Sequence, residues 1–249
     1  MTARNVDMTM AKGDNYGGEV SFTDGLVEIM AFEPMTAKMR DDYELDGGDV
    51  NLSQIDLTMD GFYSDLTGLV DLANWPEQTY HIVDSDIDLP TMKDIFFADD
   101  PFTVTGDARF VGAWHIFDGG RELTGQFQSD DWTLNGLAFP DTNGSLVWTR
   151  DRFEVFDYVS GFYGGDARLT YLMAPLGTSQ QGMATLDTVV TNVDVFALSE
   201  AVALAGVRPA GSVSGHNLLR WPLGQFDSHT GTGRLEVTAP SGSSPLMTP

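Results

Sequence analysis

Apolar and polar residues alternate along several stretches of the chain. Residues 55–60 read Ile-Asp-Leu-Thr-Met-Asp, residues 166–171 read Asp-Ala-Arg-Leu-Thr-Tyr, and residues 234–237 read Arg-Leu-Glu-Val. A period of two is typical of a strand with one apolar and one solvated face, as in antiparallel sheets. The pattern therefore predicts an all-β fold.

Turn signals separate these stretches. They are Thr23-Asp24-Gly25, Asp46-Gly47-Gly48-Asp49, Asp60-Gly61, Asp118-Gly119-Gly120, Asn143-Gly144 and Gly164-Gly165-Asp166. Asp-Gly and Asn-Gly readily adopt the positive φ that tight hairpins need. The chain is thus expected to form a meander of many short strands.

Helical patterns are scarce. The best one runs from Asp194 to Ala205, where Asp194 can cap the helix and Gly206 can end it. A second short helix is expected over 91–98, after Pro90. We predict one or two short helices in a protein that is otherwise strand and turn.

A degenerate tripeptide, Leu/Val-Thr/Ser-Gly, recurs along the chain. Its glycines are Gly68, Gly106, Gly125, Gly161 and Gly215, and their separations lie close to multiples of 18 to 19 residues. Such a step fits a repeated hairpin with strands of about seven residues. Chance recurrence in a Gly-rich chain is the alternative explanation.

The chain is strongly acidic. It has 249 residues with 37 Asp and Glu, 13 Lys and Arg, and a net charge of −24 at pH 7. This charge disfavours binding to nucleic acid, because phosphate backbones are bound through Lys and Arg. An anionic membrane surface is disfavoured for the same reason. Asp outnumbers Glu by 28 to 9, which favours turns and also resembles the surfaces of proteins adapted to high salt.

No cofactor, metal or catalytic site is predicted. The chain lacks cysteine, its four histidines are scattered, and it has no phosphate-binding or nucleophile motif. Asp84, Asp86 and Asp88, with Asp99 and Asp100 nearby, could offer oxygen ligands to calcium. The EF-hand spacing and the Gly-Gly-x-Gly-x-Asp nonapeptide are both absent, so a solvated acidic face is the favoured explanation for these residues. We expect the protein not to be an enzyme.

A sheet that is apolar on one side must cover that side. It can close as a sandwich, dock on another protein, or curl into an open trough that holds an apolar ligand. The periodicity alone does not choose among these three arrangements.

The stretch from Leu57 to Tyr171 resembles the repetitive region of bacterial AsmA/TamB-like proteins. The resemblance rests on residues 56–80, 92–127 and 141–177, with their Gly-centred strands and their Trp-Pro and Tyr-Gly-Gly-Asp landmarks. It extends to the helix at 194–205 and to residues 209–226. The family crosses the periplasm in cell-envelope biogenesis, so the resemblance implies that this chain is an interior fragment of such a protein.

The resemblance implies an elongated, repetitive antiparallel sheet curled into a taco-like groove. We expect a β-groove segment over 1–190, a short helix and further strands of the same array over 191–240, and a flexible tail over 241–249. The groove would carry phospholipid between the inner and outer membranes or assist outer-membrane protein assembly. The partners would be phospholipid acyl chains and outer-membrane assembly proteins, and the full-length protein would be periplasmic, held at the inner membrane by an anchor outside this chain.

The apolar residues at alternate positions are the candidates for lining this groove. They are Ile55, Leu57, Met59, Leu66, Val70, Leu72, Phe110, Trp114, Leu146, Trp148, Leu169, Tyr171 and Met173. Ordinary sheet core is the alternative role for each of them. At the level of the whole chain, the alternative is an extracellular structural or adhesive β-rich domain, stabilised by calcium, whose apolar face is closed.

Overall fold

The described residues form one antiparallel sheet of 15 strands that does not close on itself. This computed structural model describes residues 2–12, 15–27, 34–98, 101–204 and 209–240. The strands follow one another in chain order from β1 to β15, except that β2 pairs only with β3. The predicted all-β curled sheet is confirmed.

The bounds of the elements are as follows. The strands are β1 (Thr2–Met8), β2 (Ala11–Lys12), β3 (Tyr16–Val27), β4 (Met35–Asp46), β5 (Asp49–Met59), β6 (Phe62–Asp71), β7 (Gln78–Asp88), β8 (Val104–Phe117), β9 (Gly120–Leu134), β10 (Leu137–Thr149), β11 (Phe153–Phe162), β12 (Gly165–Ala174), β13 (Met183–Asp194), β14 (Ser212–Pro222) and β15 (Thr230–Thr238). The helices are α1 (Leu89–Phe96), α2 (Val195–Ala201) and the 3-10 turn η1 (Phe226–Ser228).

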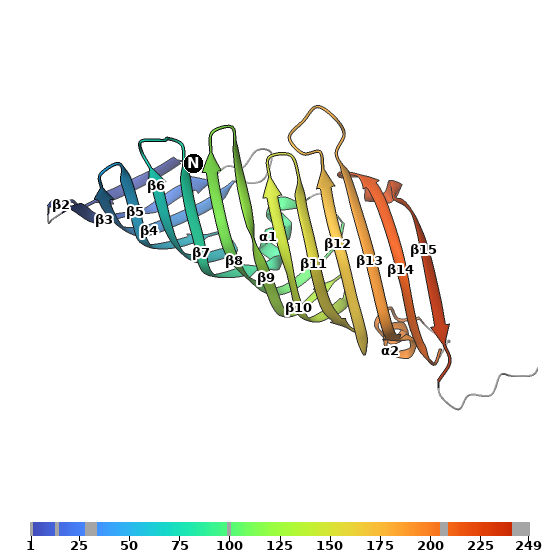
Figure 1. Ribbon diagram of the computed structural model, residues 1–249. Helices are drawn as coiled ribbons and strands as arrows, with labels where there is room; N and C mark the ends of the chain where they lie inside the picture. Colours follow the sequence, from blue (N-terminus) through green and yellow to red (C-terminus); the bar gives the residue numbers. More distant parts are fainter. Residues whose placement is uncertain (1, 13–14, 28–33, 99–100, 205–208, 241–249) are drawn as a thin grey trace, which may run out of the picture.

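The strands curve, and the sheet forms an elongated trough with α1 lying inside its curve (Figure 1). One break in register occurs in each pairing from β3–β4 to β8–β9, and again in β10–β11, β11–β12 and β13–β14. Such bulges bend a strand and increase its twist. We therefore attribute the trough to a row of bulges that runs across the sheet.

Serine side chains replace ladder hydrogen bonds at these bulges. Ser85 Oγ donates to the carbonyl of Phe110 at 2.8 Å and accepts from the Phe110 N–H at 2.9 Å. Both bonds fall between Ile82 and Ile87, where β7 and β8 lose their register. Ser129 Oγ donates in the same way to the carbonyl of Asp107 beside the β8–β9 bulge. Small hydroxyl side chains thus satisfy backbone groups that the bend has unpaired.

The strands are longer than the sequence predicted. From β3 to β14 each has between 10 and 15 residues, against an expected seven. Two predicted turns, Thr23-Asp24-Gly25 and Asn143-Gly144, lie inside β3 and β10. At Gly144 a β-carbon would come within 2.5 Å of the Phe127 ring, so this glycine makes room for a neighbour and does not turn the chain.

Both predicted helices are present with shifted ends. Helix α1 begins at Leu89, because the Asp88 side chain caps it by accepting from the Thr91 N–H, and it ends two residues earlier than expected. Asp194 caps α2 as predicted, accepting from two backbone N–H groups, but α2 ends at Ala201. The predicted stop at Gly206 lies outside the described residues.

The predicted division near residue 190 falls within β13, and β14 and β15 continue the same sheet. The predicted tail over 241–249 also lies outside the described residues.

Candidate functional site

The strand registers place the groove candidates on one face of the sheet. Residues directly opposite each other in an antiparallel pair share a face. Ile55 faces Leu66, Trp114 and Trp148 both face Leu123, and Tyr171 faces Val155, which in turn faces Leu146. Following such pairs and the alternation within strands puts every candidate except Leu72 on this face. Leu72 directly follows the last residue of β6.

We call this the inner face, because it is the face that α1 covers. The Phe96 ring of α1 meets the Trp148 ring edge-on, with centroids 6.0 Å apart, and α1 lies inside the curve of the sheet (Figure 1). The buried cluster of Ile55, Leu66, Ile82 and Phe110 also belongs to this face. The inner face therefore forms the core where the strands bend and is partly roofed by α1.

Burial of the candidates decreases from the bend towards the strand ends. Ile55, Leu66 and Phe110, at the bulges, are at most 7% exposed, whereas Trp114 is 39% and Leu72 48% exposed. The remaining eight candidates are half-buried. The bend is thus filled by side chains, and solvent reaches apolar surface nearer the strand ends.

Two rows of aromatic rings line the inner face on either side of the bend. One row has centroid separations of 5.1 to 6.3 Å and consists of Tyr80 with Trp114, then Trp148, Phe153, Tyr171, Trp221 and Phe226. The other consists of Trp132, Phe139, Phe162 and Tyr163, near the opposite strand ends, with separations of 4.9 to 5.1 Å. Such rings offer large apolar surfaces along both walls of the trough.

Several of these aromatic residues were not among the sequence candidates. Tyr80, Phe153 and Trp221 each belong to a short alternating stretch, Tyr80-His81-Ile82, Phe153-Glu154-Val155 and Leu219-Arg220-Trp221, so the period-two pattern could have found them. Trp221 could have been found through its Trp-Pro pair, but the matching Trp75 lies in a turn and is 66% exposed. The shared dipeptide therefore does not identify a shared position.

Among the described residues, Asp41 is the carboxyl side chain that is buried on the inner face. Asp41 in β4 pairs with Val20 and Ile55, is 3% exposed, and its Oδ1 has no hydrogen-bond partner. Burial raises the pKa of Asp41 to about 6, with a smaller contribution from the carboxylate of Asp42. Burial and the charge of Asp41 in turn raise the pKa of Tyr80.

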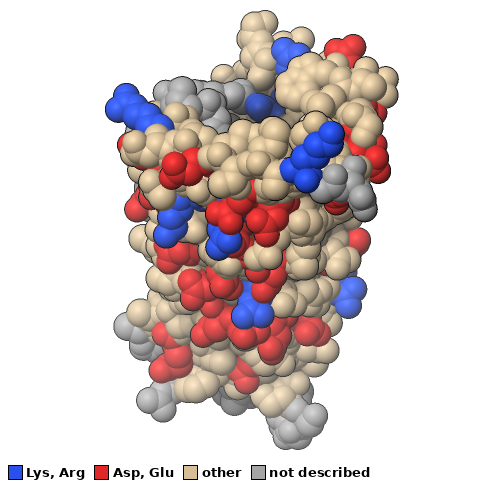
Figure 2. Space-filling view, turned by 90° about the vertical axis from the view of Figure 1, so that its left-hand side faces the viewer, with Lys and Arg blue, Asp and Glu red and all other residues tan. Residues whose placement is uncertain are grey.

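The outer face is acidic. Asp56 faces Asp65 and Asp65 faces Asp84, so three carboxylates lie in one row across β5, β6 and β7. In the view of Figure 2, Asp and Glu side chains gather over the middle of the surface with few Lys or Arg side chains among them. This arrangement keeps the outer face hydrated.

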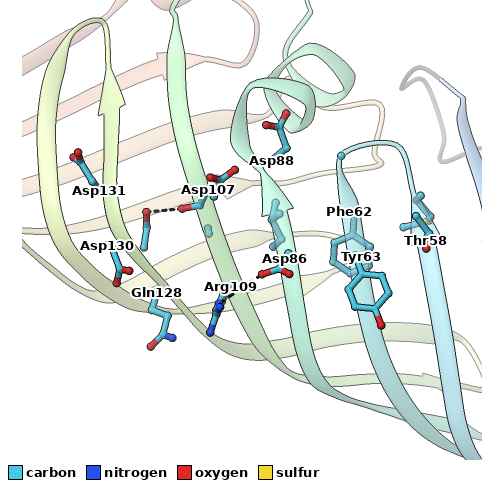
Figure 3. Close-up of a pocket in the computed structure, with 15 residues that line it drawn as sticks. Thr58, Phe62, Tyr63, Asp86, Asp88, Asp107, Arg109, Gln128, Asp130 and Asp131 are labelled. Carbon is cyan, nitrogen blue, oxygen red and sulfur yellow. Dashed lines mark hydrogen bonds and ion pairs between the residues drawn. The ribbon is translucent and has the colours of Figure 1, made fainter.

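An open hollow of about 730 Å³ lies beside this row. Its lining includes Asp86, Asp88, Asp107, Asp130 and Asp131, and also Arg109, whose Nε is 3.5 Å from Asp86 Oδ1 (Figure 3). The hollow repels anions and attracts cations. However, the described part of the chain contains no group of three or more His, Cys, Asp or Glu side chains arranged to hold a metal ion.

The Asp side chains that the sequence suggested as calcium ligands have different neighbours in the structure. Asp84 faces Asp65, Asp86 faces Tyr63, and Asp88 caps α1. Asp99 and Asp100 lie outside the described residues. The closed apolar face of the alternative fold would need a second sheet, and the strands that the structure describes belong to one.

The fold and site define a single-layer, open β-sheet protein with an apolar inner face and an acidic outer face. Comparisons of the chain with protein-family models, with curated proteins and with solved structures found no match. Within the described ranges, no helix is long and apolar enough to cross a membrane.

Proposed function

We propose that this chain is a non-enzymatic module of an AsmA/TamB-like envelope protein whose inner face carries phospholipid acyl chains between the inner and outer membranes. The observation that carries the proposal is the continuous inner face, which presents apolar and aromatic side chains on strand after strand of one open sheet. The apolar surface that solvent reaches nearer the strand ends offers a site for an apolar occupant.

The physical chemistry of acyl chains suits such a face. Burial of a methylene contributes about 0.8 kcal/mol, so a trough binds a lipid tail without a specific polar contact. The two aromatic rows supply rigid apolar walls near the strand ends, where the inner face is most exposed. Headgroups would stay in water at the rim of the trough.

The acidic outer face fits a module that works in an aqueous compartment. The whole chain has a net charge of −24, and the carboxylates on the outer face keep the sheet hydrated and repel anionic lipid headgroups from that face. The proposal places the module in the periplasm, with the inner-membrane anchor elsewhere in the full-length protein. Assistance to outer-membrane protein assembly is the other use that the same apolar face would allow.

A photo-crosslinking amino acid placed on either face of β8 tests the proposal. Trp114 on the inner face is 39% exposed and Val111 on the outer face is 43% exposed, so the two positions are matched in accessibility and differ in face. With phospholipid present, we expect lipid adducts by mass spectrometry at position 114 and few at position 111. Circular dichroism checks that both variants keep their β content.

Equal adduct yields at the two positions, or none at position 114, would overturn the lipid proposal. Adducts of position 114 with unfolded outer-membrane protein in place of lipid would favour the assembly function instead.

A further inference from the structure

The Asp41 carboxyl lies in an apolar layer, and within the part of the chain that the structure describes it forms no ion pair with a Lys, Arg or His side chain. Its inner-face neighbours on the adjacent strands are Val20 and Ile55, and its neighbours along β4 on the same face are Met39 and Tyr43. Oδ1 is buried without a hydrogen-bond partner. A carboxylate in this position is poorly solvated, and it can keep its charge only by drawing water into the bend.

The charged and titratable groups around Asp41 do not compensate for its burial. Arg40, the nearest base along the strand, forms an ion pair with Glu19 at 2.7 Å and is on the outer face. Asp42 adds negative charge. From β7, Tyr80 approaches closely enough for Asp41 to affect it, but its hydroxyl donates to Gln78. Tyr43 donates its hydroxyl to the carbonyl of Thr9.

An acyl chain laid over this part of the inner face would have to remove the water that a charged Asp41 needs. A protonated Asp41 does not need this water, so binding of the acyl chain and protonation of Asp41 favour each other. By linkage, whatever binds the protonated form more tightly also raises the proton affinity.

We propose, on the basis of the proposed lipid function, that an acyl chain binds the inner face over β3 to β7 together with a proton on Asp41. Acidification then tightens lipid binding at this end of the trough. At the other end, over β10 to β14, no described Asp or Glu side chain is buried on the inner face. Lipid binding there is therefore independent of pH.

Site-specific crosslinking measures the two ends of the trough separately. A photo-crosslinking amino acid replaces Leu57, which lies two residues from the strand partner of Asp41, or Tyr171 in β12 as the reference position. The lipid is phosphatidylcholine in vesicles, whose headgroup does not titrate between pH 5.5 and 7.5. Met59 replaces Leu57 as the labelled position if circular dichroism shows that the first variant does not fold.

At limiting lipid, we expect the adduct yield at position 57 to rise about 20-fold from pH 7.5 to pH 5.5, following the protonated fraction of a group that titrates near 6. The yield at position 171 should stay constant. In the background of Asp41→Asn, which keeps the size and removes the charge, position 57 should give the high yield at both pH values. Asp46→Asn, at the exposed end of the same strand, should behave like the unaltered chain.

The outcomes distinguish failure of the Asp41 proposal from failure of the lipid function itself. A yield at position 57 that does not change with pH, or that changes equally in Asp41→Asn, overturns the role of Asp41 alone. Adducts at position 171 without adducts at position 57 do the same. No lipid adduct at either position at any pH overturns the lipid function as well.

Discussion

Asp41 shapes the pH dependence of stability at the scale of a single residue. Its folded-state pKa of about 6 lies above the usual value, so the folded protein binds more protons than the unfolded chain between about pH 4 and pH 6. The contribution of Asp41 to the free energy of unfolding therefore falls as the pH rises through this range, and it stays lower above it. Many other carboxyl groups titrate too, so the contribution of Asp41 has to be isolated by substitution.

Asp41→Asn is expected to stabilise the protein at pH 8 and not at pH 4. The gain in the free energy of unfolding, relative to the unaltered chain, should grow by on the order of 2 kcal/mol between these pH values. Urea denaturation at both pH values measures it. Asp46→Asn is the control, because Asp46 is exposed at the end of the same strand. A gain that is the same at pH 4 and pH 8 would contradict the assignment of the buried charge to Asp41.

The bulges determine the shape of the molecule at the scale of the element. Ser85 is 1% exposed, and its side chain makes the two hydrogen bonds that the backbone of Phe110 lacks at the β7–β8 bulge. We expect Ser85→Ala to leave a buried N–H and a buried carbonyl unsatisfied and to lower the free energy of unfolding by about 2 to 4 kcal/mol.

Ser53→Ala provides the matched control for this prediction. Ser53 also donates to a backbone carbonyl, that of Asp42, but it is exposed, so its loss should cost no more than about 0.5 kcal/mol. Chemical denaturation of both variants gives the comparison. Similar small losses in the two variants would mean that Ser85 does not support the bend.

Local sequence signals predicted the turns and caps where no tertiary contact competed. Asp46-Gly47-Gly48-Asp49, Asp60-Gly61 and Gly164-Gly165 form turns with positive φ at Gly47, Gly61 and Gly164, and Asp194 caps α2. The same kind of signal failed at Asn143-Gly144, because there the glycine accommodates the Phe127 ring from the neighbouring strand. The dipeptide alone does not indicate which strand will lie beside it in the sheet.

The net charge acts at the scale of the whole molecule through the outer face. Asp65 has a carboxylate directly opposite on each side, Asp56 and Asp84, and it accepts a hydrogen bond from the Tyr63 hydroxyl at 2.7 Å. Like charges directly opposite on neighbouring strands destabilise a sheet. A chain of this charge is therefore expected to be more stable in salt, as a protein adapted to high salt would be.

Asp65→Asn should relieve this repulsion while keeping an acceptor for Tyr63. We expect the free energy of unfolding to rise by about 0.5 to 1 kcal/mol in 20 mM salt. The gain should shrink in about 0.5 M sodium chloride, where the screening length is only a few ångströms. Asp227→Asn in the exposed turn η1 is the control. A gain that does not respond to salt would argue against electrostatic repulsion along the row.

The sequence by itself determined the class of fold and the face on which the apolar residues lie. Period-two alternation is a local property, and the groove candidates within strands share one face because successive side chains of a strand point to opposite sides. The charge of the chain likewise required a solvated surface opposite that face.

Only the tertiary structure decided where the sheet bends, which side chains fill the bend and that Asp41 lies among them. These features depend on register between strands and on bulges, and each bulge reverses the alternation that a sequence pattern assumes. The aromatic rows also arise from residues on different strands that come together only when the registers are set. An acidic residue in an alternating segment indicates a solvated position until the neighbouring strands place it inside.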